Sequence, residues 1–252
     1  MRKEMAITKN VERLLLAVRA LTAGQHGHER MGLLYGSPGE GKTTTIDHAI
    51  DKVNGIALRA KMCWTSTGML SELATELRLP EKIRRSNRAN VMINSIIEAL
   101  NNNPRPIFID EVDRLVMAHN RTNGDKIMES LRDIHDLVGI PVILVGEEES
   151  AVNIQLNGRF ARRITQWVEF KGIDRDDART VSDTVSEVGI TDDLLDHLYR
   201  EAGANIGRII IGIGNIERHG KALNLGEVNL SAWGDKALFF DAPVFARRRS
   251  RA

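Results

Sequence analysis

A glycine-rich segment near the start of the chain carries the residue types best suited to holding phosphate: residues 36–43 have the sequence Gly-Ser-Pro-Gly-Glu-Gly-Lys-Thr. Glycines let successive backbone N–H groups turn inward around phosphate oxygens, a geometry that side chains would obstruct. At this spacing the ammonium of Lys42 reaches the β- and γ-phosphates, and the hydroxyl of Thr43 coordinates Mg²⁺. The segment predicts a site for ATP and Mg²⁺, to which we assign Gly36, Ser37, Pro38, Gly39, Glu40, Gly41, Lys42, Thr43, Thr44 and Asp110.

Two adjacent carboxylates, Asp110 and Glu111, follow an apolar run about 70 residues further along the chain. Asp110, at the tip of the predicted strand, would hold the water shell of Mg²⁺ together with the hydroxyl of Thr43. Glu111 would orient and polarise the water that attacks the γ-phosphate. Such a pair is weak evidence alone, but in combination with the glycine-rich segment it predicts an ATP-hydrolysing site.

The segments that must position these residues alternate between strand and helix. Apolar runs predict strands at residues 31–35, 56–60, 106–109, 141–145 and 165–170. Apolar residues at helical spacing predict helices at 11–21, 68–77, 90–100 and 125–138, and a further helix should begin near Lys42. This alternation predicts an α/β fold with a parallel sheet covered by helices on both faces.

The pattern changes near residue 172 and is purely helical beyond it, with predicted helices at 174–187, 191–202, 207–217 and around 230–238. We therefore expect an α/β nucleotide-binding core over residues 1–172 and a small helical lid over residues 173–240. Residues 241–252 form a basic tail with nothing apolar to anchor it, which we expect to be disordered.

Composition excludes several classes of protein. The single cysteine cannot form an internal disulfide, and no apolar run approaches the ~20 residues that span a bilayer, so we expect a cytoplasmic protein with no membrane contact. Aromatic residues make up 4% of the chain, too few for a base-stacking platform. The net charge of +1 averages over three basic clusters, which predict either phosphate contacts or a solvated face: Arg84, Arg85 and Arg88; Arg159, Arg162 and Arg163; and Arg247, Arg248, Arg249 and Arg251.

Between about Leu33 and Leu223 the chain resembles the AAA+ ATPases that serve DNA transposition, the target-capture ATPases (B proteins) of Mu-like transposable phages and their TnsC-type relatives. The resemblance lies in the order of four segments, GSPGEGKT, FIDEVDRL, PVILVG and GRFARRI, and in the short helical lid. It implies an AAA+ P-loop NTPase that assembles with ATP into a helical filament on duplex DNA, without sequence specificity. It also implies action on a transposase partner in the cytoplasm of a bacterial host.

The resemblance also implies roles for particular residues. Arg159 occupies the arginine-finger position, which would reach the γ-phosphate of a neighbouring subunit, although Arg162 or Arg163 could take that role. Arg208 matches the sensor-2 position. A plain surface cluster, a DNA contact and a solvated helix start are the alternatives for these arginines. The tentative DNA contacts are Lys61, Arg84, Arg85, Arg88, Arg247, Arg248, Arg249 and Arg251.

The sequence departs from this family in two places. The phage B proteins carry an N-terminal helix-turn-helix domain, whereas this chain starts almost directly at the ATPase core, so DNA binding is expected from the core or the tail. At the sensor-1 position, where a small polar residue such as asparagine is usual, stands Glu147. A carboxylate there repels the γ-phosphate unless it is protonated, turned away or paired with arginine. Either Glu147 faces elsewhere or hydrolysis is slow.

Three other functions share the same core: a replication initiator or helicase loader, a secretion-associated ATPase without nucleic acid, and a nucleotide-dependent scaffold with negligible turnover. Trp64 could face DNA, although packing at a strand–helix junction is the simpler expectation. Four histidines, His26, His28, His119 and His135, lack metal-ligand spacing and are interpreted as surface or loop residues, with no zinc site.

Overall fold

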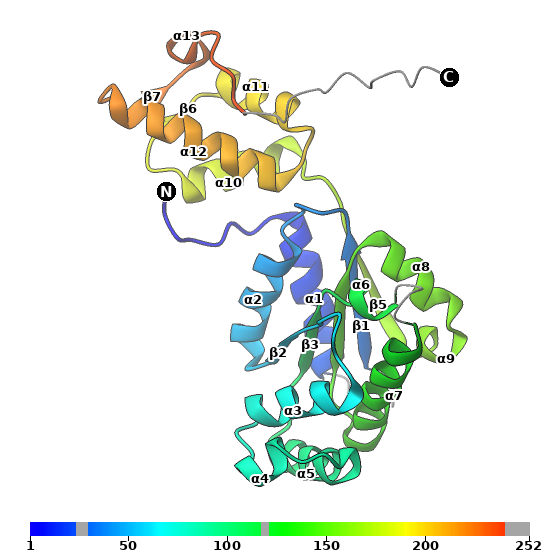
Figure 1. The fold of residues 1–252 in the computed structure, drawn as a ribbon. Coiled ribbons are helices and arrows are strands. Elements are labelled where there is room, and N and C mark those ends of the chain that lie inside the picture. Colours follow the sequence, from blue (N-terminus) through cyan, green and yellow to red (C-terminus); the bar gives the residue numbers. More distant parts are fainter. Residues whose placement is uncertain (24–29, 117–120, 240–252) are drawn as a thin grey trace, which may run out of the picture. The chain divides into compact units, whose positions relative to one another are not determined.

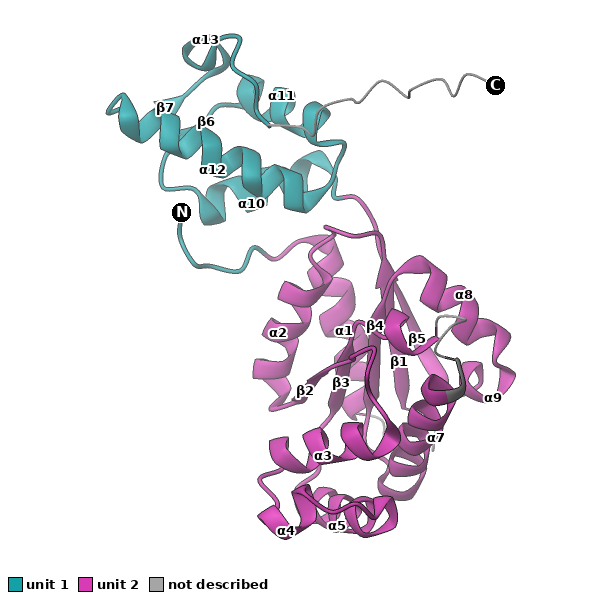
Figure 2. Ribbon diagram, viewed as in Figure 1, with its two compact units in different colours: residues 1–6, 173–252 teal, residues 7–172 magenta. Residues whose placement is uncertain are grey.

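The computed structural model describes residues 1–23, 30–116 and 121–239 and divides into two compact units (Figure 2). The core unit comprises residues 7–172, and the helical unit comprises residues 1–6 together with the chain from Ile173 onward. Residues 1–6, which the sequence analysis assigned to the core, belong to the helical unit: the backbone N–H of Arg2 donates to the carbonyl of Val185 at 2.8 Å, and Ala6 joins its apolar cluster.

A five-stranded parallel sheet forms the centre of the core unit, with the strand order β2-β3-β4-β1-β5 (Figure 1). The strands are β1 (Met31–Gly36), β2 (Ile56–Arg59), β3 (Ile107–Asp110), β4 (Val142–Gly146) and β5 (Ile164–Phe170). The predicted α/β fold, a parallel sheet with helices on both faces, is confirmed.

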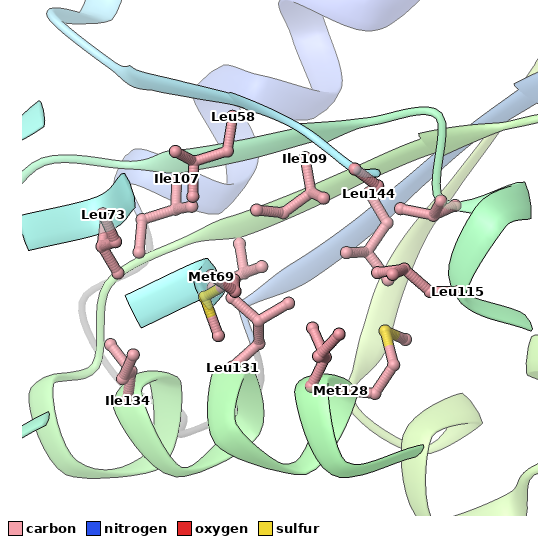
Figure 3. Close-up of a cluster of buried hydrophobic side chains, with 14 of the residues drawn as sticks. Leu58, Met69, Leu73, Ile107, Ile109, Leu115, Met128, Leu131, Ile134 and Leu144 are labelled. Atoms are coloured by element: carbon pink, nitrogen blue, oxygen red, sulfur yellow. The ribbon is translucent and has the colours of Figure 1, made fainter. Parts of the chain in front are cut away.

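Alternate residues of each strand face opposite sides of the sheet, and each side has its own helices. Leu34 and Phe108 pack with α1 (Lys9–Ala23) and α2 (Lys42–Val53) on one face. The opposite face packs against α3 (Ser66–Glu76), α5 (Ala89–Asn102) and α7 (Arg121–Val138), and Figure 3 shows Leu58, Ile107, Ile109 and Leu144 of the strands facing Met128, Leu131 and Ile134 of α7. The inner strands β1, β3 and β4 are buried on both faces, which is why their sequences are nearly continuous apolar runs.

Four short helices of the core unit were not predicted: α4 (Glu81–Arg84), α6 (Asp113–Val116), α8 (Glu148–Leu156) and α9 (Gly158–Ala161). Three of them have only four residues, too few to show helical spacing. In α8 the buried face consists of Ser150, Ala151 and Ile154, so the apolar stripe that would indicate a helix is nearly missing.

The helical unit contains α10 (Arg175–Val185), α11 (Asp192–Ala202), α12 (Ile206–Ala222) and α13 (Leu230–Trp233) around one apolar cluster. It is not purely helical, contrary to the prediction: β6 (Gly189–Ile190) pairs in parallel with β7 (Glu227–Val228). Strands of two residues cannot show an alternating pattern, so the sequence carried no signal for them.

Two side chains considered in the sequence analysis are buried. His135, interpreted as a surface or loop residue, is fully buried in α7, and its Nδ1 lies 2.8 Å from the carbonyl oxygen of Ile140. The ring packs in the core because its polar atoms find backbone partners. Trp64 is 3% exposed and donates through Nε1 to Glu72 at 2.9 Å, which confirms the packing alternative. His26, His28 and His119 lie outside the described residues.

No helix within the described ranges combines the length and the apolar character needed to cross a membrane.

Candidate nucleotide-binding site

The strand order brings three polar segments together at one edge of the sheet. Strand β4 lies between β1 and β3, with Tyr35 beside Gly146 and Ile109 beside Leu144. The glycine-rich loop at the end of β1, the carboxylate pair at the end of β3 and Glu147 after β4 therefore meet at the carboxyl ends of parallel strands. This edge is where α/β sheets bind their ligands.

The glycine-rich loop adopts the backbone that its sequence favours. Gly39 and Gly41 have φ angles of 81° and 78°, in the left-handed region that residues with side chains rarely enter. Gly36 is close-packed as well, because a Cβ there would lie 2.4 Å from the carbonyl oxygen of Phe170. Helix α2 starts directly after Gly41, and no side chain caps its first turn. Uncapped N–H groups and the helix dipole both favour an anion at this point.

Lys42, the first residue of α2, folds back over the loop. Its Nζ donates to the carbonyl oxygens of Gly36 at 2.7 Å and Ser37 at 2.8 Å. Burial lowers the pKa of Lys42, and nearby carboxylates, Glu147 foremost, oppose that shift. An incoming phosphate would replace these carbonyl oxygens as the partner of the ammonium.

The two predicted Mg²⁺ ligands lie in contact. The hydroxyl of Thr43 donates to Oδ2 of Asp110 at 3.0 Å. Hydroxyl and carboxylate oxygens are ligands that Mg²⁺ prefers, and one or two of them, completed by phosphate and water oxygens, are its usual protein contribution. The donor set therefore fits Mg²⁺, although no group of three His, Cys, Asp or Glu side chains in the described part of the chain could hold a metal without such additional ligands.

Glu111 is held by two arginines and by an unusual backbone. Its φ angle is 57°, rare for a residue with a side chain. Its carboxylate forms ion pairs with Arg59, the last residue of β2, and with Nη2 of Arg114 at 2.5 Å. The hydrogen bond from Arg59 is the largest cause of a lowered Glu111 pKa. The two arginines therefore favour the ionised form of the carboxylate, which is the form that can polarise water. They also pair with its oxygens in this structure.

Asp113, Arg59 and Arg114 are site residues that the sequence analysis missed. Asp113 accepts hydrogen bonds from the backbone N–H of Glu147 at 2.7 Å and from the hydroxyl of Ser150, and so fixes the start of α8. Asp113 comes two positions after Glu111, and this short spacing could have identified it as a candidate site residue. Arg59 had no such signal, because its position beside β3 depends on the strand order.

These segments surround a pocket of about 310 Å³, lined by Pro38, Gly39, Gly41, Lys42, Thr43, Thr44, Asp110, Glu111, Asp113, Gly146 and Glu147. Of the residues predicted to bind the nucleotide, three lie outside this lining. Gly36 and Ser37 offer carbonyl oxygens to Lys42, and the hydroxyl of Ser37 donates to Glu148 at 2.9 Å. Glu40 is 8% exposed, and burial raises the pKa of its carboxyl.

None of the three arginines proposed as fingers lines this pocket. Arg163 binds Asp136 through Nε at 3.0 Å and Nη2 at 2.7 Å. Arg162 is exposed and donates through Nε to the carbonyl of Gly158. Arg159 is exposed on α9. Arg208 belongs to the helical unit, where its guanidinium lies 4.2 Å from the centre of the Phe239 ring.

The tentative DNA contacts of the core unit differ in their surroundings. Lys61 pairs with Glu72 at 2.7 Å, and Arg85 pairs with Glu81 at 2.9 Å. Arg84 is half-buried and Arg88 is exposed. Arg247, Arg248, Arg249 and Arg251 lie outside the described residues.

A sequence model described as the AAA domain matches residues 25–154, more than half of the chain. The chain belongs to the AAA domain family. The glycine-rich loop, β3 with its carboxylate pair and β4 all fall within the matched segment. No curated protein matches the sequence.

Solved structures share the fold of this AAA protein at low sequence identity. The ORC1 protein of Aeropyrum pernix, solved in complex with DNA, is 13% identical with a TM-score of 0.62, covering 90% of this chain and 64% of its own. Cdc6p of Pyrobaculum aerophilum is 14% identical with a TM-score of 0.65, covering 90% and 66%. The ORC2 protein of A. pernix, solved with ADPNP and ADP, is 14% identical with a TM-score of 0.67, covering 88% and 65%. The chain thus spans about two thirds of each of these proteins.

Proposed function

We propose that this protein is an ATP-dependent, DNA-binding ATPase that oligomerises on duplex DNA. The observation that carries the proposal is the meeting of Lys42, the Thr43–Asp110 pair and Glu111 around one pocket. Lys42 binds the terminal phosphates, and Thr43 and Asp110 hold Mg²⁺, which when bound neutralises phosphate charge. Glu111 orients and polarises the attacking water.

A second copy of the chain would complete the nucleotide site. Arg159 is exposed, and it does not line the pocket of its own subunit. A guanidinium supplied across an interface would pair with the terminal phosphate in a fixed fork geometry. ATP would then stabilise contact between subunits, and hydrolysis would loosen it. Of the alternatives, Arg163 fits least well because its guanidinium already holds Asp136. Arg208, on the helical unit, is proposed as the sensor-2 residue.

Duplex DNA is the proposed partner, bound mainly through its phosphates and hence with little sequence preference. Arg88 and Arg84 support this on the core unit, and Lys61 and Arg85 could exchange their present carboxylate partners for phosphate. The A. pernix ORC1 protein, of similar fold, is described in complex with DNA.

For the biological role we propose target selection and transposase activation in DNA transposition, which rests on the order of the sequence motifs. A second candidate, replication initiation, is favoured by a different observation, the similarity in fold to ORC1, ORC2 and Cdc6p. The two roles differ in how the protein occupies DNA. A filament that binds through phosphates can cover any duplex, whereas initiation at defined sites requires the protein to select particular sequences.

Nuclease protection and electron microscopy on random-sequence duplex DNA, with ATP, ADP or no nucleotide, test the proposal. We expect continuous protection and helical assemblies with ATP only. Discrete footprints at particular sequences would favour the initiator role. Absence of DNA binding with ATP at low salt would contradict both roles and leave a nucleotide-dependent protein without nucleic acid.

A further inference from the structure

The end of strand β4 places one more carboxylate at the nucleotide pocket. Glu147 directly follows Gly146, and Gly146 is the register partner of Tyr35, the residue before Gly36. The backbone N–H of Glu147 donates to Asp113 at 2.7 Å, which fixes this position at the start of α8. The Glu147 side chain is exposed and lines the same pocket as Lys42.

Other carboxylates around the pocket accept hydrogen bonds or form ion pairs. Asp110 accepts from Thr43 and is the proposed Mg²⁺ ligand. Glu111 is paired with two arginines, and Asp113 accepts two hydrogen bonds. Within the described ranges, no side chain donates a hydrogen bond or forms an ion pair with the carboxylate of Glu147. Among the described residues that line the pocket, Glu147 is thus the one carboxylate without a side-chain hydrogen bond or ion pair.

Lys42 is the only cation that lines the pocket among the described residues, and it must serve both Glu147 and a bound phosphate. Burial lowers the pKa of Lys42, and of the carboxylates that oppose this shift Glu147 has the largest effect, ahead of Asp113 and Asp110. Because both side chains line one pocket, the Glu147 carboxylate and a bound phosphate would both lie within electrostatic range of the Lys42 ammonium.

We propose that Glu147 sets the nucleotide preference of the isolated subunit by selecting against the γ-phosphate, and so lowers its affinity for ATP relative to ADP. This inference rests on the proposed function, because it assumes that the pocket binds adenine nucleotides. The γ-phosphate adds negative charge to a pocket that already holds the Glu147 carboxylate, which has no ion pair of its own among the described residues, and like charges at short range repel. ADP lacks that group and is affected less.

The preference has a consequence for assembly. An isolated subunit offers the γ-phosphate one ammonium shared with Glu147. A second copy of the chain that supplies a guanidinium, as proposed for Arg159, adds the missing positive charge. Glu147 thereby makes tight ATP binding depend on contact between subunits, whereas a subunit with a neutral residue at this position would bind ATP tightly alone.

The test compares Glu147→Gln with Glu149→Gln as a matched control. Each substitution removes one charge from the same run of three glutamates, and both side chains are exposed, so neither should disturb the fold. Glu149 lines a different cavity, which it shares with Asn153 and Phe160. The backbone hydrogen bond from residue 147 to Asp113 does not depend on the side chain and is retained.

Dissociation constants for ATP and for ADP, each with Mg²⁺, are measured by isothermal titration on protein dilute enough to be monomeric. We expect Glu147→Gln to bind ATP about tenfold more tightly, equivalent to ~1.4 kcal/mol, with a change of less than about threefold for ADP. Glu149→Gln should change neither constant. An ATP-to-ADP affinity ratio that stays within about twofold of wild type in Glu147→Gln, or that moves equally in Glu149→Gln, would overturn the inference.

Failure of the inference and failure of the proposed function give different results. If wild type binds neither nucleotide, or binds both as well after Lys42→Ala, the pocket is not a nucleotide site and the proposed function fails. If both nucleotides bind in a Lys42-dependent manner but the ratio is insensitive to Glu147, only the preference assigned to Glu147 is wrong.

Discussion

Arg59, the last residue of β2, forms an ion pair with Glu111, which directly follows the neighbouring strand β3. The hydrogen bond from Arg59 is the largest cause of the lowered Glu111 pKa. As the pH falls through that pKa, the carboxylate gains a proton and can no longer polarise water. Arg59→Gln should raise the pKa toward its ordinary value, so the acid limb of the hydrolysis profile should move to higher pH.

The measurement is the rate of ATP hydrolysis as a function of pH under saturating ATP. The control is Arg19→Gln, which alters an exposed arginine near the end of α1. An acid limb at the same pH in wild type and in Arg59→Gln would show that the ion pair does not persist in the state that hydrolyses ATP.

Lys42→Ala should abolish ATP binding and ATP-dependent assembly and leave the fold intact. The variant removes the ammonium that the loop holds through the carbonyl oxygens of Gly36 and Ser37, at the point where phosphate is expected. Lys52→Ala, at an exposed position of the same helix, is the matched control. The affinity of each variant for a fluorescent ATP analogue is measured at equilibrium and compared with that of wild type. Circular dichroism checks that both variants are folded. Wild-type affinity in Lys42→Ala would defeat the assignment.

Glu111→Gln should still bind ATP but hydrolyse it ~10²–10⁴-fold more slowly, the usual contribution of a positioned acid–base group. Because hydrolysis is proposed to loosen the assembly, the variant should form longer-lived oligomers on DNA. Single-turnover hydrolysis and dissociation after dilution measure the two effects. Glu98→Gln, an exposed position on α5, should behave as wild type. Normal single-turnover hydrolysis in Glu111→Gln would remove this residue from the proposed chemistry.

Arg159→Ala should abolish the rise of ATPase activity per subunit with protein concentration. A finger supplied across an interface works only where subunits are in contact, and such arginines typically contribute ~10³–10⁵ in rate. Arg162→Ala is the comparison, because it alters a second exposed arginine three residues away. If Arg162→Ala alone abolishes the rise, the finger is Arg162. Turnover per subunit that is constant from dilute to concentrated wild-type protein would exclude a shared site.

Binding to duplex DNA should require ATP and weaken with salt. Deleting residues 247–252 removes four arginines and should flatten the slope of log affinity against log salt by at most ~3–4 units, since each phosphate contact contributes about −0.9. Affinity for all sequences should fall alike, because phosphate contacts carry no sequence information. Arg88→Ala should change the slope by about one unit. A truncated protein with an unchanged slope would show that the tail does not contact DNA.

The chemistry of the pocket was largely predictable from the sequence, for a local reason. The glycine-rich loop turns around phosphate because of residues that are consecutive in the chain, and the observed φ angles of Gly39 and Gly41 match that requirement. Alternation of apolar runs with helical spacing predicted the parallel sheet, because strands buried on both faces must be apolar throughout.

Which side chains surround the pocket was decided by the tertiary structure. Strand order is not written in any local pattern, yet it is the position of β4 between β1 and β3 that brings Glu147 beside Lys42. The pairing of β2 with β3 likewise places Arg59 at Glu111, and the packing of α7 near the start of β5 lets Asp136 hold Arg163. The spacing of residues along the chain therefore determined which groups can bind phosphate and Mg²⁺. Contacts between distant segments decided which other charged side chains lie next to those groups.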